Sequence, residues 1–341
     1  MMTQLRRPRW TLVAAIAFAL VAAAFTYGWQ TQSGYYAFLP DPAHPAAKVV
    51  HAPGGKPPAD GTGFYFVDVN LLHANLIQKL WAEHLVDGAD LVPDKEILAP
   101  GESNSQRVSQ DMHAMTNSQT TAQVVAERAL GKKVPIDEQG ALLTGIEPQS
   151  PAAKAGLAAG DIVTGVDGKP VKTSADLIHL MAPVKPGQSV RLALRGHAPE
   201  TVGTVADPHD ATHALLGVGV ADAVKVGKLP VHVSFSTGDI GGPSAGLAFA
   251  LEIYDSLSGR HLLDGHKIAV TGELDLGGGV HAIGGVKQKT VGAIDAGADV
   301  FLVPRGDNLR DAQKEANGRI KVIGVTSFAQ ALKVIRALPP R

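Results

Sequence analysis

The sequence predicts an α+β protein made of an N-terminal transmembrane helix, a β-rich unit with two helices, and an α/β unit. Three observations support this prediction. An uncharged apolar run lies near the N-terminus, short strands and helices separated by turn signals fill the middle, and strands alternate with helices towards the C-terminus. With 341 residues, 45% of them hydrophobic, the chain can build more than one buried core.

The apolar run covers residues 10–29 and follows three arginines. A helix of this length spans a hydrocarbon core of roughly 30 Å. The arginines predict that residues 1–9 stay in the cytoplasm and that the rest of the chain is exported, as in a single-pass cell-membrane protein. A cleaved signal peptide is the alternative, because residues 22–24 are alanines, although the run is longer than a usual signal h-region.

Composition excludes several classes of site. The 31 basic residues balance 32 acidic ones, so no basic field is expected to bind nucleic acid. The absence of cysteine excludes disulfides, a thiolate zinc site and a cysteine nucleophile. His209 and His213 have a metal-compatible spacing, but no third ligand accompanies them, so a surface loop is favoured and neither metal nor cofactor is expected.

The segment after the apolar run is rich in proline. Residues 30–60 contain six prolines between positions 40 and 58, which predicts a stalk without regular structure. Beyond it, residues 63–70 are expected to form a strand, residues 71–85 a helix, and residues 120–130 a further helix.

A β-rich unit is expected over residues 131–205. It contains strands at 141–146 and 162–166, and Ser150 and Pro151 form the N-cap and first turn of a short helix. Ser174 can cap a second helix that runs to residue 181.

The motifs SPAAKAGL (150–157), GDIV (160–163) and VDGKPV (166–171) make this unit resemble a bacterial PDZ domain. The resemblance implies that a peptide tail binds as an added strand, with residues 134–136 as the candidate groove strand. Pro135 would remove a hydrogen-bond donor there. A PDZ fold that acts only as a spacer is the alternative.

The C-terminal unit covers residues 206–341. Strands are expected at residues 231–236, 267–271, 300–303 and 320–325, and helices at 247–257, 287–296, 309–316 and after Ser327, which opens the last helix. The glycines at 277–279 indicate a hairpin turn.

Ser244 lies in a glycine-rich segment just before a predicted helix. Glycines allow close approach of a substrate chain, and free N–H groups at a helix start suit an oxyanion. Ser244 could also be a simple helix cap.

Lys287 follows at the start of another helix, where a cation is electrostatically disfavoured. A neutral amine would avoid this electrostatic penalty. A lysine that takes the proton of a serine hydroxyl needs a pKa lowered from about 10.4 towards about 7. Ile283 and Val286 offer apolar surroundings, and Thr271 could orient the amine. The alternative for Lys287 is an exposed surface lysine.

Three blocks, GPSAG (242–246), TGE (271–273) and IGGVK (283–287), resemble the proteolytic domain of Lon proteases in order and spacing. The resemblance implies a serine nucleophile at Ser244 and a general base at Lys287. The supporting and oxyanion positions are Gly242, Pro243, Ala245 and Thr271.

Two departures from that family stand out. Gly241 occupies a position where many Lon sequences have an aspartate, which leaves Asp239 as the nearest acid. No segment fits the phosphate-binding loop G-x4-GK[ST], so an activity independent of ATP is expected. The arrangement resembles bacterial membrane-anchored, PDZ-containing S16 peptidases.

The sequence therefore predicts a serine endopeptidase for extracytoplasmic or membrane-proximal proteins, selected in part by the PDZ unit. The alternative is an inactive PDZ scaffold. Because Lon-type domains often form rings, a homo-oligomer is a further possibility. Because residues 206–341 are short for a full Lon domain, the segment 61–130 is expected to pack on it, with the PDZ unit inserted. The expected divisions are 1–9 (cytoplasmic), 10–29 (anchor), 30–60 (stalk), 61–130 (strand and helix), 131–205 (PDZ-like) and 206–341 (Lon-type).

Overall fold

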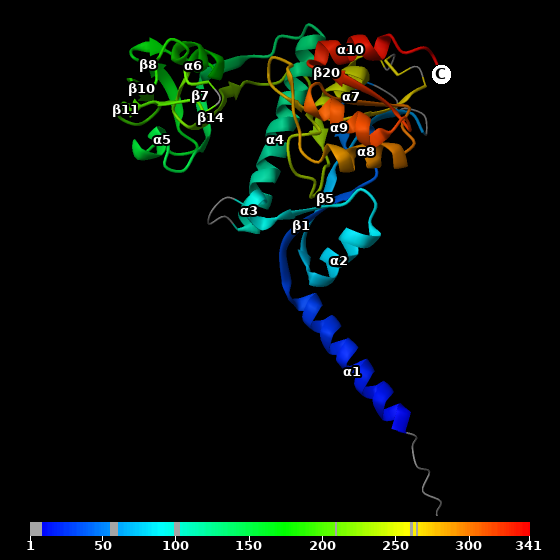
Figure 1. The fold of residues 1–341 in the computed structure, drawn as a ribbon. Coiled ribbons are helices and arrows are strands. Elements are labelled where there is room, and N and C mark those ends of the chain that lie inside the picture. Colours follow the sequence, from blue (N-terminus) through cyan, green and yellow to red (C-terminus); the bar gives the residue numbers. More distant parts are fainter. Residues whose placement is uncertain (1–8, 55–60, 99–102, 209, 260–261, 264) are drawn as a thin grey trace, which may run out of the picture. The chain divides into compact units, whose positions relative to one another are not determined.

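The chain divides into two compact units in the computed structural model, which describes residues 9–54, 61–98, 103–208, 210–259, 262–263 and 265–341. Unit 1 combines residues 1–133 with 230–341, and unit 2 consists of residues 134–229. In the sequence, unit 2 is thus an insertion into unit 1. Figure 1 shows the order of the elements along the chain.

Helix α1 (Arg9–Gln30) is apolar and exposed along its length. Its segment Leu12–Gln30 has a mean hydropathy of 2.0 and only 6% of it is buried. Length and composition suit a membrane anchor or a signal sequence.

The segment expected to be a stalk is instead folded over residues 32–51. Strand β1 (Gln32–Pro40) pairs with β5 (Val69–Asn75) and β6 (Asp90–Pro93) in an antiparallel sheet covered by α2 (Leu76–Leu85). Two of the prolines are compatible with strands, because Pro40 ends β1 and Pro45 lies on a two-residue edge strand, where no ladder N–H is needed. Residues 55–60 lie outside the described part. The short elements that follow β1 are β2 (His44–Pro45), η1 (Ala46–Lys48) and β3 (Val50–His51).

The main sheet of unit 1 has the order β2-β4-β16-β19-β20, and all pairs except β2·β4 are parallel. Strand β4 (Gly63–Phe66) lies beside β16 (Lys267–Val270), so residues far apart in sequence share one sheet. The single strand expected at 63–70 is divided between two sheets, with β4 in the main sheet and the start of β5 in the antiparallel sheet. The helix begins at residue 76, where Asn75 caps it. The other two strands are β19 (Val300–Pro304) and β20 (Lys321–Val325).

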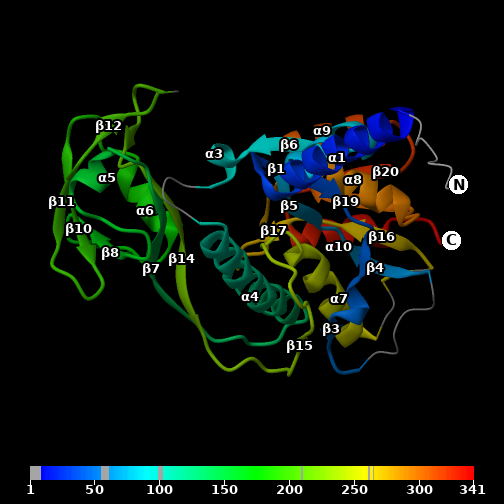
Figure 2. The ribbon, with the colours of Figure 1, turned by 90° about the horizontal axis from the view of Figure 1, so that it is seen from below.

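Helices cover both faces of this sheet, because its side chains alternate between two cores. Phe64, Ile268 and Leu302 face the core built with α4, α7 and α10, whereas Tyr65 and Phe301 face α8 and α9. Figure 2 shows the helices around the sheet. The bounds are α4 (Asn104–Ala129), α7 (Gly246–Ser258), α8 (Val286–Asp295), α9 (Asp307–Ala316) and α10 (Phe328–Arg336), with a short α3 (Asp94–Ile97) before α4.

Small elements complete unit 1. The expected strand at 231–236 is reduced to β15 (Ser234–Phe235), and the triple glycine forms the turn between β17 (Glu273–Leu274) and β18 (Val280–His281). Helix α4 is much longer than the expected helix at 120–130. Its N-terminus is fixed by a Ser103–Gln106 capping box.

Unit 2 is a β-sheet with two helices, α5 (Pro151–Lys154) and α6 (Ser174–Met181). The main strands run in the order β11-β10-β8-β7-β14, with β9 beside β8, around a core that includes Leu143, Val163 and Leu192. The unit extends to residue 229, beyond the expected end at 205, because β14 pairs with β7 along its length. The strands are β7 (Ile136–Ile146), β8 (Ile162–Val166), β9 (Lys169–Pro170), β10 (Ser189–Leu194), β11 (Glu200–Gly203), β12 (Val205–Ala206), β13 (Ala214–Leu215) and β14 (Val218–Val226).

One glycine allows α8 to pack closely against the segment after β1. A Cβ atom on Gly292 would lie 2.0 Å from the carbonyl oxygen of Asp41, and the Gly292 carbonyl accepts the N–H of Ala43 at 3.3 Å. Gly292→Ala is therefore expected to destabilise unit 1 by about 1–3 kcal/mol, measured by thermal unfolding. Gly284→Ala is the control, because a Cβ there meets no atom within 4 Å. Equal stability of both variants would contradict the close packing.

Candidate active site

Ser244 lies in the loop that leads into α7. The N-cap of that helix is Ala245, and Ser244 makes no capping bond to it. Ser244 is half-buried, directly before a helix whose first residues are fully buried. The simple capping role is thus wrong, and the hydroxyl remains available for other contacts.

Helix α4 holds this loop from one side. The N–H of Gly242 donates to the carbonyl of Asp111 at 2.7 Å, and the hydroxyl of Ser118 donates to the carbonyl of Pro243 at 3.0 Å. A Cβ on Gly241 would lie 2.8 Å from the Asp111 Cβ. The aspartate found here in many Lon sequences would therefore clash with α4.

The end of β16 holds the loop from the other side. The carbonyl of Ser244 accepts the N–H of Gly272 at 2.8 Å and the hydroxyl of Thr271 at 3.2 Å. Thr271 is fully buried. Its hydroxyl orients the serine backbone, and not the lysine amine as expected from the sequence.

The side chain that reaches Ser244 is Lys289, on the first turns of α8. Its Nζ donates to the Ser244 Oγ at 2.8 Å, and the residue is only 5% exposed. Burial removes the ammonium from water and lowers the pKa of Lys289 to about 8, while the negative charge of Asp68 opposes this by raising the pKa. An amine with this pKa is partly neutral at physiological pH and can accept a proton.

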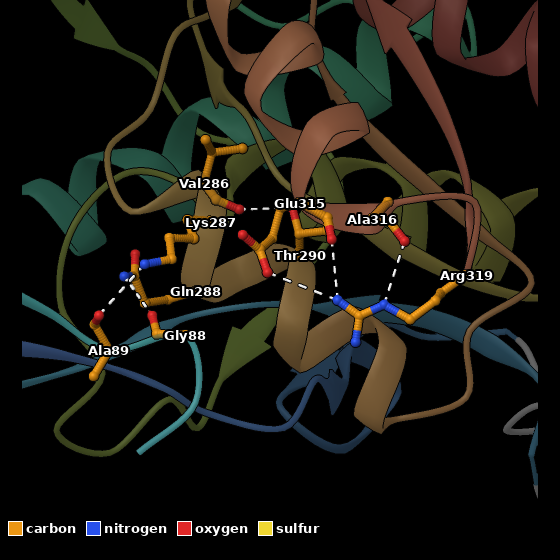
Figure 3. A network of polar contacts seen from close by, with 9 residues as sticks. All are labelled: Gly88, Ala89, Val286, Lys287, Gln288, Thr290, Glu315, Ala316 and Arg319. Atoms are coloured by element: carbon orange, nitrogen blue, oxygen red, sulfur yellow. Dashed lines mark hydrogen bonds and ion pairs between the residues drawn. The ribbon is translucent and has the colours of Figure 1, made fainter. Parts of the chain in front are cut away.

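The prediction that Lys287 partners Ser244 is wrong. The Lys287 Nζ forms an ion pair with Asp90 at 2.7 Å and also donates to the carbonyl of Ala89 at 3.4 Å. Its side chain is 39% exposed. The neighbouring Gln288 donates to the Gly88 carbonyl at 2.8 Å, so these two side chains tie α8 to the loop before β6 (Figure 3).

The helical repeat explains the error. Residues two apart in a helix lie on nearly opposite faces, so Lys287 and Lys289 cannot both face Ser244. Lys289 shares its face with Val286 and Ala293, both buried. The spacing i, i+3, i+7 of these three residues is visible in the sequence and would have favoured Lys289.

A polar cluster lies near Lys289. Atoms of Asp41, His44 and Asp68 lie within 4.8 Å of one another, a donor set that a divalent cation could use. The Nε2 of His44 lies 2.7 Å from the Oδ2 of Asp41 and 3.6 Å from the Oδ1 of Asp68. Burial raises the pKa of the Asp68 carboxyl, and the charge of His44 lowers it.

The two histidines considered as metal ligands do not form such a group in the described residues. His213 is paired with Asp210 at 2.9 Å, and His209 lies outside the described residues. Asp239, the acid nearest to Ser244 in sequence, is exposed.

Backbone donors for an oxyanion are limited in this loop. Pro243 has no N–H, the N–H of Gly242 donates to Asp111, and that of Gly246 donates to the Pro243 carbonyl at 3.2 Å. In the described part of the chain, the N–H groups of Ser244 and Ala245 have no acceptor. These two N–H groups, at the nucleophile and the residue after it, are therefore free to bind an oxyanion.

Unit 2 offers a different kind of site at β14. This strand ends the sheet and contacts α6. The hydroxyl and the N–H of Ser174 donate to the carboxylate of Asp222 at 2.6 and 2.7 Å, linking helix and strand. Ile178 on α6 is 61% exposed. Ile136, the last residue of the expected groove strand at 134–136, begins β7 and pairs with Val226 of β14, so the groove at 134–136 stays a prediction.

Comparisons with known proteins find two domain families. Residues 218–337 match the Lon protease (S16) C-terminal proteolytic domain, and residues 119–204 match the PDZ domain. The chain therefore carries a Lon-type proteolytic domain together with a PDZ domain. The residues matched to the Lon domain include β14, which in the structure belongs to unit 2.

Lon proteases are among the curated proteins that this chain resembles. That of Mesomycoplasma hyopneumoniae is 39% identical over 104 residues, or 29% of this chain and 12% of that protein. That of Malacoplasma penetrans is 31% identical over 164 residues, or 45% of this chain and 20% of that protein. The chain thus spans a fifth or less of the length of these relatives.

Among solved structures, the PDZ domain of an SdrC-like protein from Listeria monocytogenes is 27% identical. The matched region covers 26% of this chain and 93% of the Listeria chain, with a TM-score of 0.22.

Proposed function

We propose that the chain is a serine endopeptidase in which Ser244 is the nucleophile and Lys289 the general base. The Ser244 Oγ attacks the carbonyl carbon of the substrate peptide bond while its proton passes to the neutral Nζ of Lys289. The carbonyl oxygen becomes an oxyanion that accepts hydrogen bonds from the N–H groups of Ser244 and Ala245.

The second half of the reaction releases the products. The Lys289 ammonium gives its proton to the leaving amine as the C–N bond breaks, which leaves an acyl ester on Ser244 and a neutral lysine. Water then attacks the ester, its proton passes to Lys289, and the carboxylic acid leaves as the Ser244 hydroxyl is restored.

The contact between Lys289 and Ser244 carries this proposal. A nucleophile and base within hydrogen-bond distance are the geometric requirement, and a buried lysine with a pKa of about 8 is the chemical one. A scaffold that binds partners through unit 2 needs neither feature, which disfavours the alternative of an inactive adaptor.

The proposal extends to location and substrate choice. We place the proteolytic unit outside the cytoplasm, anchored by α1, because the basic residues precede the apolar helix. We propose cleavage without ATP of unfolded or membrane-proximal proteins, since the printed sequence lacks a phosphate-binding loop of the G-x4-GK[ST] type. Metal and cofactor have no step in this reaction. Light scattering would measure whether the chain assembles into rings.

The test uses the full chain in detergent with an unfolded protein such as casein. Wild type is expected to cleave it equally with and without ATP, and Ser244→Ala is expected to lose activity by at least about a thousandfold. A fluorophosphonate that labels wild type but not Ser244→Ala would identify the nucleophile. Full activity of Ser244→Ala would overturn the dyad, and no cleavage by wild type would favour the scaffold.

Substrate selection is assigned to the free edge of β14 beside α6. A peptide added to β14 as a further strand would place its side chains against the exposed Ile178. Ile178→Asp is expected to weaken binding of an apolar C-terminal peptide by about tenfold, measured by fluorescence anisotropy. Thr201→Asp on β11, the opposite end of the sheet, is the control. Equal losses in both variants would contradict this assignment.

A further inference from the structure

We propose that α2 is a second membrane contact, lying in the lipid–water interface beside the point where α1 leaves the bilayer. This inference rests on the proposed anchoring by α1. It adds a surface of the folded unit that recognises the lipid itself.

One face of α2 is apolar and uncovered. Leu80, Trp81 and Leu85 are 54%, 43% and 77% exposed and lie within roughly 140° of the helix circumference, an arc that also holds the exposed His84. The opposite face is occupied by Ala82, which is 1% exposed and packs on the three-stranded sheet. Outside α1, only three other large hydrophobic residues among those described are exposed: Val108, Ile178 and Val205.

This apolar face begins where α1 ends. The N–H of Leu76, the first residue of α2, donates to the carbonyl of Thr31 at 3.0 Å. Gly28 lies so close to Ile77 that a Cβ there would be 2.9 Å from the isoleucine Cδ1. Helix α2 therefore starts in contact with the C-terminal end of α1, and Figure 1 shows the two helices beside each other at this point.

The residue types around this junction suit a lipid interface. Tyr27 and Trp29 on the last turns of α1 are 68% and 54% exposed, and Trp81 adds a third amphipathic ring. The Lys79 Nζ lies 3.8 Å from the centre of the Tyr35 ring, which places a cation beside this junction. Amphipathic helices with Trp and Leu on one face bind membranes in this way.

The contact would orient the catalytic unit. The loop that follows α2 is tied to α8 by the bonds from Lys287 to Asp90 and from Gln288 to Gly88. Helix α8 also carries Lys289. A fixed α2 therefore fixes the orientation of the catalytic helix relative to the membrane surface, which favours membrane-proximal segments of a substrate.

The test uses the full chain in phosphatidylcholine vesicles, with the three tryptophans as reporters. W10F/W29F leaves Trp81 as the single fluorophore, and W10F/W81F leaves Trp29. Lipids brominated near the headgroup end of the acyl chain are expected to reduce Trp81 emission about twofold and deeply brominated lipids to reduce it less. Trp29 is expected to be quenched in the same vesicles.

Two outcomes separate the possible failures. Quenching of Trp29 without quenching of Trp81 would overturn the interfacial role of α2 and leave the anchor intact. Absence of quenching at both would overturn the anchor and the inference together. Because the chain has no cysteine, Leu85→Cys gives a unique thiol. Its crosslinking between copies, with Trp81 unquenched, would assign the face to a second chain instead of lipid.

Discussion

Lys289→Met is expected to lower the rate of proteolysis by about a hundredfold to ten-thousandfold, the contribution typical of a general base. Methionine fills the buried space of the lysine stem but cannot accept the proton of Ser244. Because it replaces a buried amine with an apolar group, the fold is expected to remain intact. The measurement is the turnover of casein at pH 8, with circular dichroism to confirm folding.

Lys287→Met is the matched control, since it makes the same substitution two residues away in the same helix. Lys287 is a partly exposed lysine paired with Asp90, so its loss should change activity by no more than about twofold and stability by about 0–1 kcal/mol. The reverse result, with Lys287→Met inactive and Lys289→Met active, would exclude Lys289 as the base. Loss in both variants would instead indicate that α8 must be tied to the loop before β6.

The fold could be predicted where local signals were strong. The helix before Gly259, the strand at Val300 and the Ser327 cap lie as expected, because apolar periodicity and capping act within a few residues. The segment after α1 could not be predicted. Its prolines indicate interruption locally, whereas the pairing of β1 with β5 and β6 depends on contacts between distant residues.

The site could be predicted in part for the same reason. The glycine-rich loop and Thr271 carry signals within their own segments, and the structure places both beside Ser244. The choice between two lysines two residues apart depends on which face of α8 is turned inward. The distance from Ser244 along the chain does not report that face, whereas the apolar residues Val286 and Ala293 do. Asp68 was missed because its proximity to Lys289 arises only when β4 pairs with β16.

The rate of proteolysis is expected to rise with pH and to level off above about 8, because only the neutral form of Lys289 can act as the base. Well below that pKa the neutral fraction falls about tenfold per pH unit. The rate at pH 6 should therefore be some fiftyfold to a hundredfold below the plateau. The measurement is the initial rate from pH 5.5 to 10 with a fluorogenic peptide.

Asp68→Asn is expected to move this profile to lower pH. The negative charge of Asp68 raises the pKa of Lys289, so its removal lowers the pKa and increases the neutral fraction at a given acidic pH. The variant should be more active than wild type at pH 6 and similar at pH 9. Asp239→Asn is the control, since Asp239 is exposed and does not contribute to the lowered pKa. A shift to higher pH in Asp68→Asn, or the same shift in Asp239→Asn, would show that another group sets the basicity of the dyad.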